Sequence, residues 1–142
     1  MRLLKLQRGF IAMCLAWAAA SAAWAGDHVV IIGHSTLRKL DAATVQRIYT
    51  GKVVEVDGAA VVPFNAAPGQ AVRQRFLADY LQQDEDKFVA YWTVRRYVGK
   101  GTPPREVKDA AAMIEQISKT PGAIGYVDES DVTPGMNVLL RK

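Results

Sequence analysis

The sequence has little of what disulfide, metal or nucleophilic chemistry requires. It holds one cysteine, Cys14, and two histidines, His28 and His34, in 142 residues. One cysteine cannot form a disulfide within the chain, and two histidines without a third ligand at a typical spacing do not indicate a zinc site. The glycine-flanked serine of a nucleophile elbow is also absent. We therefore predict no catalytic residue, no metal site and no cofactor.

An apolar run long enough to cross a membrane is also missing. The most apolar run, residues 10–20, is shorter than the roughly 20 residues that a membrane span needs. Alanines at positions 23 and 25 follow it as an A-x-A cleavage site, and three cations precede it: Arg2, Lys5 and Arg8. We expect a signal peptide over 1–25, cleaved between Ala25 and Gly26, and a periplasmic or otherwise exported domain over 26–142. An uncleaved N-terminal anchor is the alternative.

The chain has little net charge outside this N-terminal segment. The formal net charge of +4 includes the three cations of the expected signal peptide, which leaves 15 basic residues against 14 acidic ones, with the signs interspersed. Such a balance gives no support for binding to nucleic acid or to a membrane surface. The remaining 117 residues have the usual size of one domain with its own core.

Strand and helix patterns alternate along residues 28–142. Residues 28–33 form a short, continuously apolar, β-branched run, typical of a strand buried on both faces. Asp41 is placed to cap a helix that ends near Thr50. Further helices are expected at about 70–81, from Asp84 or Asp86 to 98, and at 107–117, and further strands at 60–64, 123–127 and 136–140. This alternation predicts an α/β domain.

Several short phrases then occur in an order that resembles one known family. They are IYTGK at 48–52, YW at 91–92, VGKGTPP at 98–104 and PGAIGYV at 121–127, with a helix around Phe76 between the first two. Over about residues 29–140 the chain resembles the substrate-binding proteins of phosphate ABC transporters and their short single-lobe relatives. The resemblance implies one lobe of a type II periplasmic-binding-protein-like fold, with a central, mostly parallel sheet flanked by helices.

The same resemblance implies a non-enzymatic protein that binds a small oxyanion, phosphate or sulfate. Full-length members clamp their ligand between two lobes, whereas 117 residues supply one. A homodimer is one way in which a second chain would complete the cleft. The second hypothesis is motivated by the loss of the family's hydroxyl side chains at positions 70 and 72. It is an interaction or sensor module that keeps the lobe and docks on an envelope transporter or sensor protein without high-affinity capture.

The predicted helix start at Gln70 is the first candidate for an anion site. The first N–H groups of a helix lack partners within the helix, and the helix dipole favours negative charge there. Gly69 would let a ligand approach the backbone, and Arg73 would add a charge-assisted contact. The family has Ser-Gly-Thr-Arg where this chain has residues 70–73, and only the arginine matches. The alternative is that Arg73 is a solvated residue of the helix surface.

The loop after the first predicted strand is the second candidate. Ser35 and Thr36 carry hydroxyls that suit an oxyanion, and α/β sheets bind ligands beyond the carboxyl ends of their strands. We expect this loop and the Gln70 helix start to converge on one concavity. The alternative is that Ser35 and Thr36 are ordinary turn residues.

Overall fold

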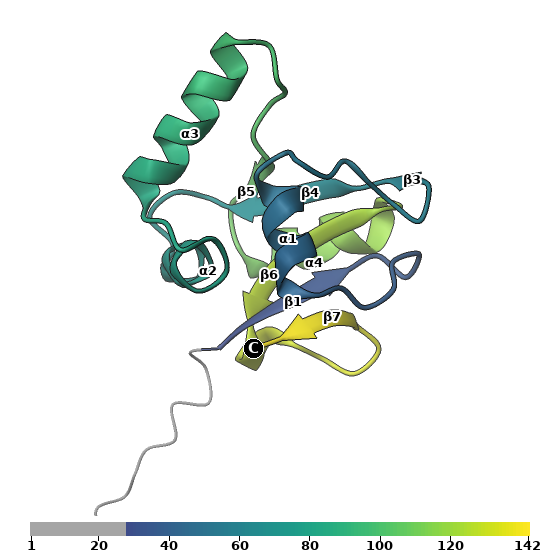
Figure 1. Cartoon of the computed structure of the whole chain (residues 1–142). Helices are drawn as coiled ribbons and strands as arrows, with labels where there is room; N and C mark the ends of the chain where they lie inside the picture. Colours follow the sequence, from purple (N-terminus) through teal and green to yellow (C-terminus); the bar gives the residue numbers. More distant parts are fainter. Residues whose placement is uncertain (1–27) are drawn as a thin grey trace, which may run out of the picture.

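A mixed five-stranded sheet forms the centre of the protein. The computed structural model describes residues 28–142, so the expected signal peptide lies outside the described residues. The strand order is β5-β4-β6-β1-β7 (Figure 1). The strands are β1 (Val29–Gly33), β4 (Val62–Ala66), β5 (Arg105–Val107), β6 (Ala123–Asp128) and β7 (Asn137–Arg141). Two further strands, β2 (Glu55–Val56) and β3 (Ala59–Ala60), pair as a separate hairpin.

The direction of β1 determines which loops share an edge of the sheet. Strand β4 runs parallel to β5 and to β6, whereas β1 is antiparallel to both β6 and β7. Four of the five strands therefore point one way, and β1 alone points the other way. The α/β prediction with a mostly parallel sheet is confirmed. The carboxyl end of β1 nevertheless lies at the opposite edge from those of β4, β5 and β6.

Helices cover both faces of this sheet. The four α-helices are α1 (Ala42–Tyr49), α2 (Ala71–Leu81), α3 (Glu85–Tyr97) and α4 (Ala110–Lys119), and a 3-10 turn, η1, spans Glu129–Asp131. On one face Val29 and Ile31 pack with residues of α1, α2 and α3, and on the other Val30 and Ile32 pack with Met113 of α4. Successive side chains of β1 point to opposite faces of the sheet, and helices cover both faces, which explains why β1 is apolar throughout. Within residues 28–142 no helix has the length and apolar character that crossing a membrane requires.

Two local features differ from the sequence prediction. Asp57 and Gly58 both have positive φ, 53° and 77°, and they form the turn of the β2–β3 hairpin, so the strand predicted at 60–64 begins at Val62 instead. Strand β5 is not predicted at all. It is a three-residue edge strand that pairs only with β4 and exposes Arg105 and Glu106, and it therefore has no apolar run that a sequence pattern would reveal.

Two buried tyrosines, Tyr49 of α1 and Tyr126 of β6, contact the end of β4. The Tyr49 hydroxyl donates a hydrogen bond to Phe64 O at 2.7 Å, and the Tyr126 hydroxyl accepts one from Ala66 N at 3.0 Å. Phe76 of α2 stacks on Tyr126, with ring centroids 4.0 Å apart. Burial raises the pKa of both phenols above the ordinary value. These contacts hold α2 against β4 and β6 and so fix the position at which α2 begins.

Candidate functional site

The start of α2 lies where β4, β5 and β6 end. Gly69 and Gln70 follow β4, and the Gln70 side-chain amide donates a hydrogen bond to Lys108 O in the segment after β5. Gly69 has φ +90°, and no atom lies within 4 Å of the position that a Cβ would take. Its backbone is therefore open to an approaching group. Gly69 and Gln70 thus occupy the place that α/β sheets commonly use for ligands.

The N–H groups at this helix start differ from those of the other helices. Asp41, Asp84 and Asp109 cap α1, α3 and α4, each accepting a backbone N–H three residues along at 2.7, 2.9 and 2.8 Å. Gln70 makes no such side-chain cap on α2. The first N–H groups bonded to Gln70 O are those of Arg73 and Gln74. The N–H groups of Ala71 and Val72 come before them and point out of the helix start, together with the positive end of the dipole.

Arg73 is directed into the protein. Only 1% of its surface is exposed. Its guanidinium contacts both carboxylate oxygens of Glu85 at 2.6 and 2.8 Å, Glu106 Oε1 at 3.1 Å and Ala66 O at 2.9 Å. Burial alone would lower the pKa of Arg73, but the hydrogen bonds and charges of the two glutamates outweigh that effect and raise it. Arg73 thus ties α2 to α3, β4 and β5, and these contacts disfavour its predicted role as an anion ligand.

Acidic side chains surround the start of α2. A shallow cavity of about 100 Å³ lies between α2, α4 and the end of β6, and its lining includes Gln70, Asp109, Asp128 and Asp131. Asp109 is used as the cap of α4, and Asp128 pairs with Arg75. The negative charge of these carboxylates lowers the local potential. Any anion held at this edge is therefore held weakly.

The Ser35–Thr36 loop lies at the other edge of the sheet. His34 N donates a hydrogen bond to Ala123 O at 2.8 Å, and the Thr36 hydroxyl accepts one from Gly122 N at 3.2 Å. Both partners are at the amino end of β6, whereas Gln70 is near its carboxyl end. The structure therefore does not bring Ser35 and Thr36 together with Gly69, Gln70 and Arg73. A single concavity formed by all five residues does not exist in this fold.

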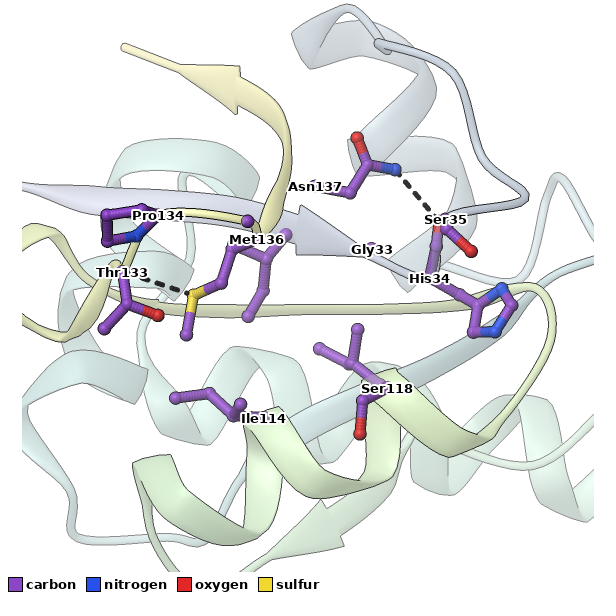
Figure 2. Close-up of a pocket in the computed structure, with 12 residues that line it drawn as sticks. Gly33, His34, Ser35, Ile114, Ser118, Thr133, Pro134, Met136 and Asn137 are labelled. Atoms are coloured by element: carbon purple, nitrogen blue, oxygen red, sulfur yellow. Dashed lines mark hydrogen bonds between the residues drawn. The ribbon is translucent and has the colours of Figure 1, made fainter.

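Ser35 instead lines a separate and larger cavity, shown in Figure 2, with a volume of about 390 Å³. Ile114 and Met136 supply apolar wall, and hydroxyls come from Ser35, Ser118 and Thr133. Asn137 fixes the loop by donating to His34 O at 2.9 Å and to Leu37 O at 2.8 Å. Among the residues that the structure describes, no Lys, Arg, Asp or Glu lines this cavity. Its chemistry suits an uncharged group better than an oxyanion.

Sequence reasoning missed the contribution of residues 133–137 to this cavity. They were predicted only as a turn and the start of a strand, and they lie about 100 positions from His34. Only the antiparallel pairing of β1 with β7 brings the two segments together. Among residues 28–142 no group of three or more His, Cys, Asp or Glu side chains is arranged to hold a metal ion.

Comparison with solved structures places the fold in a known class. The α/β sheet and its helices match one lobe of phosphate ABC transporter substrate-binding proteins. The chain matches an ABC-type phosphate transport receptor from Vibrio cholerae with a TM-score of 0.62 and 12% identity. It matches a putative phosphate ABC transporter substrate-binding protein with bound phosphate from Clostridium perfringens with 0.55 and 18%, and PstS from Borrelia burgdorferi with 0.58 and 16%.

These matches cover 79% of this chain but only 45%, 44% and 46% of the three other chains. The matched part of the chain thus spans less than half the length of each of these three proteins. No protein-family profile matches the sequence. No curated protein sequence matches it either. At these low identities the similarity establishes the fold, and any ligand has to be argued from the residues of this chain.

Proposed function

We propose that the protein is an exported, non-enzymatic binding protein of one lobe, which binds a small oxyanion, phosphate or sulfate, at the start of α2. The ligand contacts are the backbone N–H groups of Ala71 and Val72, beside the open backbone of Gly69. The observation that carries the proposal is the missing side-chain cap of α2, at the edge where β4, β5 and β6 end. Export rests on the expected signal peptide over 1–25 and leaves the domain over 26–142.

The same geometry sets the strength of binding. A hydrogen bond to a charged group contributes about 1.5–3 kcal/mol, so two contribute about 3–6 kcal/mol. Because binding also costs translational and rotational freedom, only part of that sum remains, and the dissociation constant is expected in the millimolar range. Arg73 adds no direct contact because it is bonded internally, and the neighbouring aspartates oppose binding. The proposal is therefore weak, reversible binding rather than high-affinity capture.

Isothermal titration calorimetry on residues 26–142 tests this proposal. Phosphate and sulfate are expected to bind at millimolar concentration, and glucose, as a neutral control, is not. Ala71→Glu should weaken phosphate binding at least tenfold, because it places a carboxylate beside the proposed site while a negative charge in the first turn still favours the helix. The matched control Ala43→Glu adds the same charge to the first turn of α1, where Asp41 already caps the helix.

Two results would overturn the oxyanion proposal. One is the absence of binding heat for phosphate and sulfate at 10 mM. The other is equal weakening by Ala71→Glu and Ala43→Glu, which would mean that only the overall charge matters.

A second candidate function is an interaction or sensor module that keeps the lobe without capturing a ligand. The internal ion pairs of Arg73 favour it, because they occupy the one cation that the family resemblance placed at the ligand site. Under this alternative, calorimetry detects no oxyanion. The protein would then act through its surface, by docking on an envelope transporter or sensor protein.

A further inference from the structure

The cavity beside the end of β1 lies at the edge of the sheet opposite to the start of α2. It has a volume of about 390 Å³, within the range of roughly 300–1,000 Å³ that small-molecule sites occupy. Three segments that are distant in the sequence enclose it (Figure 2): the end of β1 with its loop, the last turns of α4, and the turn before β7. It lies beyond the carboxyl end of β1, where α/β proteins commonly bind ligands. The cavity therefore has the size and the position of a binding site that is separate from the start of α2.

The inner wall of this cavity is apolar. Ile32 and Ile117 are 2% and 5% exposed, and Ile114 and Met136 are half-buried. The Met136 thioether accepts a hydrogen bond from Thr133 N at 3.4 Å, so this side chain is held within its own turn. A methionine side chain also adapts to irregular shapes. The inner wall can therefore cover the hydrocarbon part of a ligand.

Hydroxyl groups lie at the rim of the cavity. Ser35, Ser118 and Thr133 are all exposed, and they come from three different segments. The Ser118 hydroxyl donates to Glu115 O at 2.8 Å, which leaves its oxygen available as an acceptor. A hydroxyl can donate one hydrogen bond and also accept hydrogen bonds. The rim can therefore bind a polar head group that both donates and accepts, as the hydroxyl of an alcohol does.

The charges around this cavity disfavour an ionic ligand. Among residues 28–142 no Lys, Arg, Asp or Glu lines it. The cavity lies at the carboxyl end of α4, and the negative end of a helix dipole disfavours an anion there. Lys119, the basic residue of the last turn, pairs with Glu115 at 3.2 Å and does not line the cavity. An oxyanion would find no partner charge in the lining, and neither would a cation.

We propose that this cavity is a second binding site, which takes a small uncharged molecule with a short hydrocarbon body and a hydroxyl head group. The hydrocarbon body lies against Ile32, Ile117 and Met136 and is removed from water. The head group exchanges hydrogen bonds with the hydroxyls of Ser35 and Ser118 at the rim. The site is independent of the proposed oxyanion site, because the two lie at opposite edges of the sheet.

Nuclear magnetic resonance on ¹⁵N-labelled residues 26–142 tests this proposal, with hexan-1-ol as the probe. The largest amide shifts are expected at Gly33, Ser35, Ser118 and Met136, with saturation at millimolar concentration. Along the series butan-1-ol, pentan-1-ol and hexan-1-ol, each added methylene should tighten binding about two- to fourfold, because it buries more apolar surface. Hexanoate has the same number of carbons but carries a carboxylate, and it should bind about tenfold more weakly than hexan-1-ol.

Three variants test the contacts separately. Ser118→Phe should weaken hexan-1-ol binding at least tenfold, because it fills the space in which the hydrocarbon body is buried. Lys119→Phe is the matched control, since Lys119 is exposed on the same helix but outside the lining, and it should leave the affinity unchanged. Ser35→Ala removes one rim hydroxyl and should weaken binding about two- to tenfold. All three positions are exposed, and circular dichroism checks that each variant is folded.

Several results would overturn the proposal. One is the absence of amide shifts at 20 mM hexan-1-ol, and another is a set of shifts centred on Val53 and Trp92, which line a different cavity beside α3. Equal binding of hexanoate and hexan-1-ol would contradict the preference for an uncharged ligand. Equal weakening by Ser118→Phe and Lys119→Phe would exclude this cavity as the site, and an unchanged affinity of Ser35→Ala would contradict the contact with the head group.

Discussion

Replacement of Arg73 by methionine is expected to lower the free energy of unfolding by about 3 kcal/mol. The guanidinium is buried and supplies hydrogen bonds to Ala66 O and to Glu85 and Glu106. It also lies over the Phe88 ring, 5.3 Å from the centroid. Methionine fills a similar volume but leaves the buried carbonyl without a donor. The two glutamates are 36% and 51% exposed and regain water, which keeps the loss below that of a fully buried ion pair.

The control for this experiment is Arg75→Met on the same helix. Arg75 pairs with Asp128, but both side chains are partly exposed, so we expect a loss of at most about 1 kcal/mol. Chemical denaturation with urea measures both variants. Unchanged stability of Arg73→Met together with complete loss of phosphate binding would contradict this structural role of Arg73. That result would mean that the guanidinium contacts the ligand instead of the glutamates.

Replacement of Gln70 by aspartate is expected to change stability and phosphate binding in opposite directions. Gln70 already has the extended backbone of a cap residue, with φ −75° and ψ 134°. An aspartate there would cap α2 as Asp41, Asp84 and Asp109 cap the other helices, which contributes about 1 kcal/mol. The substitution also removes the Gln70 hydrogen bond to Lys108 O, so the free energy of unfolding should rise by less than that amount. Its carboxylate would then occupy the proposed anion position, and phosphate affinity should fall at least tenfold.

Gln74→Asp supplies the matched control for Gln70→Asp. Gln74 is exposed on the same helix, one turn further along. An aspartate at this position adds the same charge inside the helix, where it cannot cap the first N–H groups of α2. It should keep most of the phosphate affinity and gain no stability. Thermal denaturation and calorimetry together measure both quantities. If Gln70→Asp raised stability and left phosphate affinity unchanged, the start of α2 would not be the ligand site.

The elements with strong local signals were predictable from the sequence. Residues 28–33 had the apolar character of a strand buried on both faces, and β1 is buried at all five of its positions. The start of α3 was predicted at Asp84 or Asp86, because acidic residues favour the positive end of the helix dipole, and in the structure Asp84 is the cap, with its carboxylate accepting from Lys87 N. The start of α2 near Gln70 was predicted from the helical spacing of the apolar residues that follow it, and the structure has Gln70 as the residue before the helix. These signals are contained within a few residues.

The composition of the site depended on contacts that no local pattern encodes. Arg73 finds its partners 12 and 33 positions away, on α3 and on an edge strand that the sequence did not reveal. The direction of β1 placed Ser35 and Thr36 at the edge opposite to Gln70, and strand direction is a property of the assembled sheet. The α/β class could therefore be predicted, whereas the convergence of the two loops could not be tested until the pairing of β1 with β6 was known.

The central claim, an oxyanion held by the first N–H groups of α2, is tested most directly by nuclear magnetic resonance. Phosphate is titrated into ¹⁵N-labelled residues 26–142 at constant pH and ionic strength, and the backbone amide shifts are followed. The account predicts the largest shifts at Ala71 and Val72, with Gly69 and Gln70 next and little change at Ser35 and Thr36. Shifts centred on Ser35 and Thr36, or no amide shift at 10 mM phosphate, would contradict it.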